Sequence, residues 1–175
     1  LPLPAAFRPD PASTGTRLIL SSEGKRSPFA ATAWREAPKP CAVLAADLPG
    51  TGELAWETTD VAGTRLHDTS RACLWLGYTL AAEWAEAIAA LVHAARSLNP
   101  GGAVSVVADR ECAFAALLCQ VLLPEMPFTL QASGLPSSLR DPANDSLAWC
   151  VPGLLQWGDI DDLQRLAQAE IPPQI

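Results

Sequence analysis

The chain has 175 residues, of which 49% are apolar and 18% charged, with a formal net charge of −7 and a pI near 4.7. This length and composition predict one globular domain rather than a disordered chain. An acidic surface repels phosphate backbones, so nucleic acid is excluded as an expected partner. No run of about 18 apolar residues lacks a charge, so we expect no membrane-spanning helix.

The cysteines do not form a metal-binding pattern. No two of the five have C-x-x-C spacing, and His67 and His93 lie far apart, so we expect no zinc site. No G-x-G-x-G follows an early strand, and we predict no cofactor. Most of the cysteines lie in apolar runs, which indicates buried free thiols and favours a reducing compartment. The five are Cys41, Cys73, Cys112, Cys119 and Cys150.

The first third of the chain is rich in proline. Residues 1–15 contain four prolines and predict an extended lead-in with little structure of its own. A strand is expected over residues 16–21 and a proline-broken loop over 25–40. Residues 41–47 form a continuous apolar run, which is typical of a strand covered on both faces. A glycine-containing loop, residues 48–53, follows it.

The middle of the chain predicts a long helix, a strand and a second helix. Residues 54–72 read as irregular. Apolar residues at helical spacing predict a helix over about 76–98, which residues 99–102 (Asn-Pro-Gly-Gly) terminate. The next buried strand is expected at 103–108 and the next helix at 111–123.

The last third predicts a strand and a short helix. Residues 128–132 are expected to form a third buried strand, 133–145 a loop, and 159–168 a helix with Asp159 as its N-cap. The alternation of strands and helices implies right-handed crossovers and a mostly parallel sheet with helices on both faces. We therefore predict a three-layer α/β sandwich over residues 16–175.

The turn between the strand at 103–108 and the following helix is the most informative stretch. In serine hydrolases of the α/β class this turn carries the nucleophile in a G-x-S-x-G elbow. Here the five positions are Ala108, Asp109, Arg110, Glu111 and Cys112. A guanidinium stays protonated and cannot attack a carbonyl carbon. The residues therefore favour a hydrolase-like scaffold and argue against hydrolysis.

Three segments, in order, resemble the bacterial acetyl xylan esterase-like group of α/β-hydrolases. Residues 45–53 (AADLPGTGE) resemble the family's D-x-x-G-x-G loop after a strand. Residues 75–80 (WLGYTL) are similar to the entry into the helix before the nucleophile strand. Residues 151–163 (VPGLLQWGDIDDL) resemble the segment after the elbow. The resemblance implies an α/β-hydrolase fold and an ancestry among carbohydrate esterases.

The chain departs from this family at the catalytic positions. Arg110 stands where the resemblance places the serine, and Ala108 and Cys112 replace the flanking glycines. The family's catalytic acid and histidine follow later strands, beyond the last matching segment, so the resemblance implies a sheet lacking its C-terminal strands. We expect a degenerate domain without hydrolase activity. The alternative is an active esterase completed by a partner chain or a missing C-terminal region.

Asp109, Arg110 and Glu111 are the candidate binding residues, because ligands of open α/β sheets bind at the carboxyl ends of the strands. The planar fork of Arg110 suits a carboxylate or a sugar acid. The alternative is an ordinary helix N-terminus, with acidic residues complementing the dipole and the arginine in solvent. Cys112 is a further candidate nucleophile, although a buried structural cysteine explains it better.

The other serines and histidines do not indicate a catalytic triad. Ser105 is expected inside a strand and Ser133 outside an elbow. His67 is expected in a loop beside Asp68, and His93 on a solvated helix face. A serine without a positioned base has only the reactivity of an alcohol.

Two further interpretations concern the aromatic residues and the loop at 99–107. Trp75 and Trp84 are expected in the core, whereas Trp34 and Trp56 remain candidates for stacking on a carbohydrate. Residues 99–107 also resemble the L-x-P-G-G turn of class I methyltransferases, a weaker alternative.

Finally, a shortened sheet exposes an edge, which predicts self-association or a partner chain there.

Overall fold

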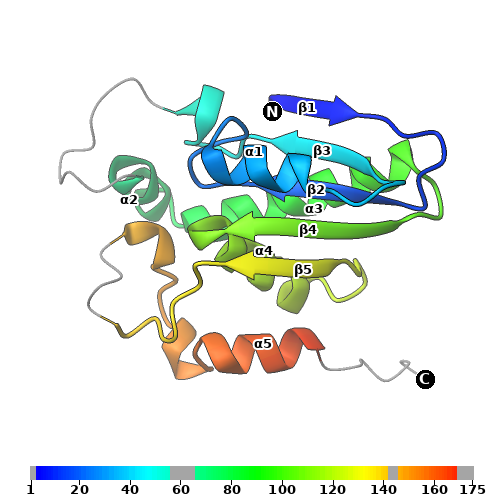
Figure 1. Cartoon of the computed structure of the whole chain (residues 1–175). Helices are drawn as coiled ribbons and strands as arrows, with labels where there is room; N and C mark the ends of the chain where they lie inside the picture. Colours follow the sequence, from blue (N-terminus) through cyan, green and yellow to red (C-terminus); the bar gives the residue numbers. More distant parts are fainter. Residues whose placement is uncertain (1–2, 56–65, 142–145, 169–175) are drawn as a thin grey trace.

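A computed structural model describes residues 3–55, 66–141 and 146–168. The five strands form one sheet in the order β1-β3-β2-β4-β5 (Figure 1). Four of them run parallel: β2 (Gly15–Leu20), β3 (Ala42–Ala46), β4 (Ala103–Asp109) and β5 (Thr129–Ser133). β1 (Ala5–Arg8) pairs antiparallel with β3 at one edge. The mostly parallel α/β sheet predicted from the sequence is confirmed.

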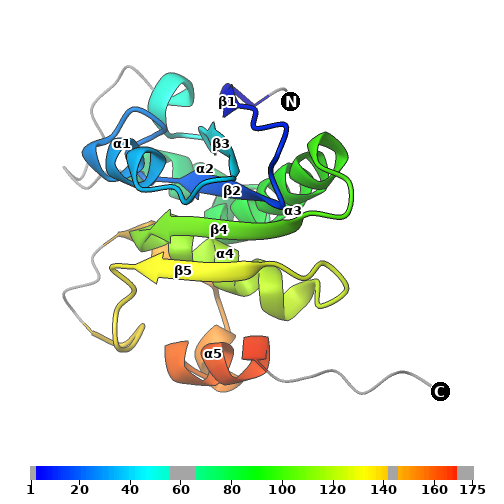
Figure 2. The same ribbon diagram turned by 45° about the vertical axis from the view of Figure 1, so that its right-hand side comes forward.

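Helices cover both faces of this sheet. α1 (Pro28–Arg35) lies on one face, while α3 (Leu80–Leu98) and α4 (Arg110–Leu122) lie on the other. α2 (His67–Trp75) packs near α3 at the carboxyl end of the strands. Figures 1 and 2 both show α5 (Ile160–Gln168) running alongside β5, at the edge opposite β1. Three short 3-10 helices complete the described elements: η1 (Gly52–Leu54), η2 (Leu147–Trp149) and η3 (Leu154–Gln156).

The core lies between the sheet and the pair formed by α3 and α4. The predicted apolar stripe of α3 is buried there, with Trp84, Ile88 and Val92 each fully inaccessible. On the other face, Ile19 and Val43 pack against α1. Strands buried on both faces read as continuous apolar runs, which is why β3 and β4 were predicted correctly.

Two helices lie where the sequence predicted loops. α1 was missed because Pro28 was interpreted as a breaker. Proline is favoured in the first turn of a helix, and Ser27 caps this one by accepting a hydrogen bond from the Ala30 N–H. α2 occupies part of the segment expected to be irregular. It was missed because its sequence is largely polar, and only Ser70 and Cys73 are buried.

Several boundaries and environments also differ from the predictions. The proline-rich lead-in is not structureless, since residues 5–8 form β1. The long helix begins at Leu80, capped by Thr79, rather than near residue 76. β5 was expected to be buried, but four of its five residues are exposed. Its edge position explains this difference, because β5 pairs with β4 alone among the described strands.

None of the helices in the described part of the chain combines the length and the apolar character that a membrane span requires.

Candidate functional site

The strand β4 turns directly into the helix α4 at Arg110. Asp109 is still extended, with φ −112° and ψ 152°, and Arg110 has a φ of 45°. Residues other than glycine seldom adopt such left-handed angles, because the Cβ approaches the following carbonyl oxygen. A strained strand-to-helix turn is the backbone geometry of a nucleophile elbow. Arg110 occupies this turn with its side chain 55% exposed.

A glycine in the turn after β5 leaves space for the Arg110 side chain. Gly134 follows β5 with a φ of 70°, and a Cβ built on it would lie 3.0 Å from the Cγ of Arg110. A larger residue here would be strained by its backbone angles and would also press on the arginine stem. Gly134 therefore helps to set the path of Arg110.

Asp109 fastens the loop that follows β2. Its carboxylate accepts hydrogen bonds from the Ser21 hydroxyl at 3.0 Å and from the Ser22 N–H at 2.8 Å. The Ser27 hydroxyl donates to the oxygen of Ser21 at 2.8 Å, which extends the network to the start of α1. The structure thus gives Asp109 a structural role that its sequence neighbours did not indicate.

Glu111 is almost completely buried, with 2% of its surface exposed. The Nε of Arg110 lies 3.6 Å from its Oε2. That Asp109, Arg110 and Glu111 bind a ligand together remains a prediction. Of the three, only Arg110 offers a largely exposed charged group.

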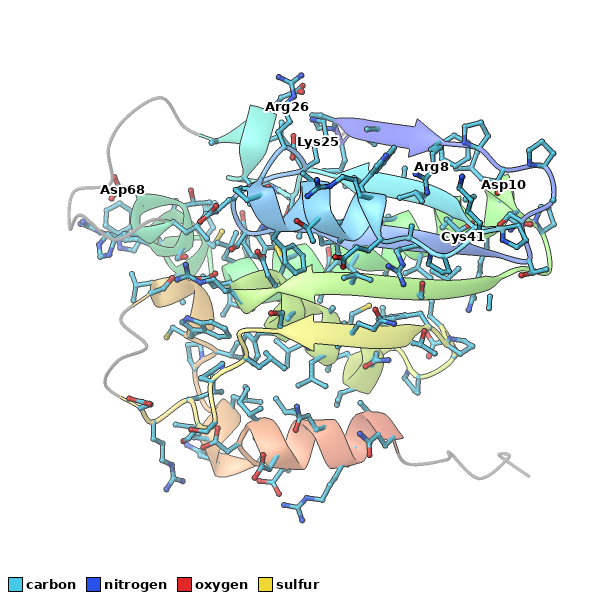
Figure 3. The ribbon with its side chains drawn as sticks, in the orientation of Figure 1. Arg8, Asp10, Lys25, Arg26, Cys41 and Asp68 are labelled. Carbon is cyan, nitrogen blue, oxygen red and sulfur yellow. The ribbon has the colours of Figure 1, made fainter. Side chains whose placement is uncertain are left out.

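A second carboxylate, Asp47, fastens the same loop from the end of β3. It accepts hydrogen bonds from the backbone N–H of Lys25 at 2.6 Å, the Nζ of Lys25 at 2.5 Å and the N–H of Glu53 at 3.1 Å. The Nζ of Lys25 also lies 2.8 Å from the Oε1 of Glu53. Figure 3 shows Arg26 pointing outward, whereas the Lys25 side chain is only 9% exposed. Before the structure, the only local indication of this pairing was the position of Asp47 at the end of an apolar run.

The pairing of Lys25 with Asp47 shifts the pKa of both side chains. Burial alone would raise the pKa of Asp47, but the hydrogen bonds from Lys25 and Glu53 outweigh burial and lower the pKa below 3.8. Burial alone would lower the pKa of Lys25, but its hydrogen bonds to Asp47 and Glu53 raise the pKa above 10.5. Both groups are therefore charged near pH 7, so Lys25 does not serve as a base.

The other candidate residues lie apart from the elbow or are inaccessible. Cys112 is fully buried in α4, as the structural interpretation predicted. His67 begins α2 rather than lying in a loop, and His93 is exposed on α3. Among the described residues, no hydrogen bond or ion pair joins either histidine to Asp109 or Arg110.

The environments of the tryptophans agree only in part with the prediction. Trp84 is in the core, where its Nε1 donates to the Pro49 carbonyl at 2.8 Å, but Trp75 is 73% exposed rather than buried. Trp34 lies on α1 with the Arg8 guanidinium over its ring at 5.4 Å. Trp56 lies outside the described residues.

Four of the cysteines are buried, and one is not. Cys150, which directly follows η2, is exposed, contrary to its apolar sequence context. Burial raises the pKa of Cys119 to about 11, which leaves this thiol protonated at neutral pH.

No protein-family model and no curated protein matches the sequence. A solved structure of a cold-adapted esterase from an Arctic intertidal metagenomic library is similar, with a TM-score of 0.51 and 17% identity. The fold is that of the α/β-hydrolases. At this level of identity the similarity shows the fold alone.

The similarity covers only part of that esterase. It extends over 76% of this chain and 54% of the esterase, so the chain spans about half of the esterase's length. A type II thioesterase from the yersiniabactin pathway aligns with a TM-score of 0.47 and 16% identity, over 93% of this chain and 64% of its own.

Proposed function

We propose that this α/β-hydrolase-like domain is related to the acetyl xylan esterase-like group, does not hydrolyse esters, and binds an acidic carbohydrate at Arg110. The observation that carries the proposal is the left-handed Arg110 in the strand-to-helix turn. The backbone there has the geometry of a nucleophile elbow, but its side chain cannot attack an ester.

The surroundings of the elbow also support a loss of hydrolysis. In α/β-hydrolases the oxyanion is stabilised by the N–H after the nucleophile and by an N–H of the loop between the neighbouring strand and the first helix. The corresponding loop here follows β2, and its Ser22 N–H already donates to Asp109. A carboxylate at this place would repel a developing oxyanion instead of stabilising it.

Arg110 suits a carboxylate ligand. Its Nε lies toward Glu111, while the side chain remains 55% exposed at the carboxyl end of the sheet. The planar guanidinium can donate two parallel hydrogen bonds to one carboxylate, which gives both affinity and orientation. A sugar acid combines this carboxylate with the carbohydrate character that the sequence resemblance implies.

The absence of hydrolysis is tested with the purified protein, p-nitrophenyl acetate and a fluorophosphonate probe. We expect no turnover above buffer and no labelled serine. Turnover or labelling would instead support the active-esterase alternative. Activity that appears only after a partner chain is added would support its completion in trans.

The ligand is tested by titrating D-glucuronate into the wild type and the Arg110→Gln variant, followed by NMR. We expect saturable binding that weakens at least about tenfold in Arg110→Gln, equivalent to about 1.4 kcal/mol. Arg165→Gln is the matched control, because this arginine is also exposed and paired with a neighbouring carboxylate. Equal binding by both variants, or equal binding of neutral D-glucose, would refute the carboxylate site.

A further inference from the structure

A groove separates the free edge of β5 from α5. A hollow of about 340 Å³ is lined by both β5 and α5. A second hollow of about 530 Å³ adjoins it between residues 124–128, which precede β5, and the end of α5, and the two share the lining residues Gln120, Phe128 and Ala167. We call them together the β5–α5 groove. It is distinct from the Arg110 site, because none of the residues from Asp109 to Glu111 lines it.

The walls of the β5–α5 groove carry no charge. Its apolar surface comes from α4, β5 and α5, notably Leu117, Val121, Leu130 and Leu166. No Asp, Glu, Lys or Arg is among the residues lining either hollow, although the chain as a whole carries a net charge of −7. The groove is therefore suited to an occupant with apolar or neutral side chains.

The backbone of β5 determines the kind of occupant. β5 pairs with β4 alone among the described strands. In a parallel sheet alternate residues bond to opposite neighbours, so every second residue of β5 presents its N–H and C=O toward the free edge. An aliphatic chain in the groove would leave these groups without partners at a cost, whereas an extended polypeptide supplies donors and acceptors at the matching spacing.

The opposite edge of the sheet is less suited to this role. β1 has only four residues, follows Pro4, precedes Pro9 and ends in Arg8. Short strands, prolines and charges at an edge discourage pairing. β5 contains neither proline nor charge.

We propose that the β5–α5 groove binds an extended segment of a separate polypeptide, which adds to β5 as a further strand. Its apolar side chains would contact Leu130 and Leu166. A second copy of this chain fits less well, because α5 runs alongside the same edge in both views. Two β5 edges would meet only if both α5 helices moved away.

The probe is a seven-residue peptide, acetyl-Lys-Thr-Val-Thr-Val-Thr-Lys-amide, titrated into the whole chain and followed by NMR. We expect the backbone amides of β5 to shift, with a Kd between about 10 μM and 1 mM. Two N-methylated analogues are the controls, one methylated on both valines and the other on the three threonines. Each analogue lacks the donors on one edge of the strand, so one should lose binding and the other should retain it. Equal binding of all three peptides, or no binding at 1 mM, would overturn the proposal.

A pair of exposed leucines locates the binding site. Leu166 on α5 is 57% exposed and lines the groove, and Leu98 at the end of α3 is 53% exposed and lies outside it. Leu166→Lys should weaken peptide binding at least about tenfold, whereas Leu98→Lys should not. Arg110→Gln should also bind the peptide normally, which separates this inference from the proposed function. A dimer without peptide that Leu166→Lys dissociates would overturn the proposal in favour of a second copy.

Discussion

Asp47 directly follows β3 and Asp109 ends β4, the two strands that flank β2, and both carboxylates hold the loop after β2. Asp47 is fully buried and receives the Lys25 ammonium and two backbone N–H groups. Asp109 is half-buried and receives one hydroxyl and one N–H, with no cation among these donors. The difference shows that an ion pair helps to hold the loop from β3, whereas only hydrogen bonds from uncharged donors hold it from β4. The loop after β2 is therefore held from both neighbouring strands, and Arg110 directly follows one of the two carboxylates that hold it.

The largest expected effect is a difference between Asp47→Asn and Asp109→Asn. Asp47→Asn leaves the Lys25 ammonium without its buried counter-charge and gives three donors a single oxygen. Breaking a buried ion pair in this way costs about 3–5 kcal/mol. Asp109→Asn keeps an oxygen for the Ser22 N–H and loses only the hydrogen bond from the Ser21 hydroxyl, so we expect about 1 kcal/mol. Urea unfolding of both variants at pH 7 measures the difference. Equal losses of unfolding free energy would show that the ion pair with Lys25 adds no stability.

The pH dependence of the Asp47→Asn effect sharpens the same comparison. The folded pKa of Asp47 is lowered, so its stabilisation is complete above its ordinary pKa of 3.8 and is lost as the pH falls through the folded pKa. The pKa of Lys25 is raised, so its share is complete below 10.5 and is lost as the pH rises through the folded pKa. The free-energy difference between wild type and Asp47→Asn should thus be constant between about pH 5 and 9 and shrink at pH 3.

Urea titrations of both proteins at pH 3, 5, 7 and 9 test this expectation. Asp159 provides an internal control, because hydrogen bonds from the Leu139 N–H and the Ser138 hydroxyl lower its pKa too. Its contribution is lost in acid in both proteins and cancels in the difference. A difference that stays constant down to pH 3 would mean that the charge of Asp47 is not what stabilises the loop.

The sequence predicted the strands best where they are buried on both faces. β3 and β4 were recognised because parallel central strands carry unbroken apolar runs. β5 was placed correctly, but its exposure was not, because a strand's own residues do not reveal that one neighbour is absent. α1 was missed because the meaning of Pro28 depends on whether it stands first in a helix or inside one.

The site was predictable only in its local part. The turn at Arg110 was found because the strand, the turn and the helix are contiguous in sequence. The partners of Asp109 lie 88 and 87 residues away, at Ser21 and Ser22, and no local pattern connects them. The Lys25–Asp47 pair spans 22 residues for the same reason. Long-range hydrogen bonds of this kind follow from the order of the strands, and a single sequence does not specify that order.

The smallest expected effect concerns the left-handed backbone of Arg110. Arg110→Ala and Arg110→Gly remove the same side-chain contacts, including that with Glu111, but only glycine adopts a φ of 45° without strain. Arg110→Gly should therefore be more stable than Arg110→Ala by about 1 kcal/mol, even though glycine gains more freedom in the unfolded chain. Urea unfolding of the two variants at pH 7 provides the measurement. If Arg110→Ala were the more stable of the two, the turn would not hold residue 110 in the left-handed region, and Arg110 would not stand in a nucleophile elbow.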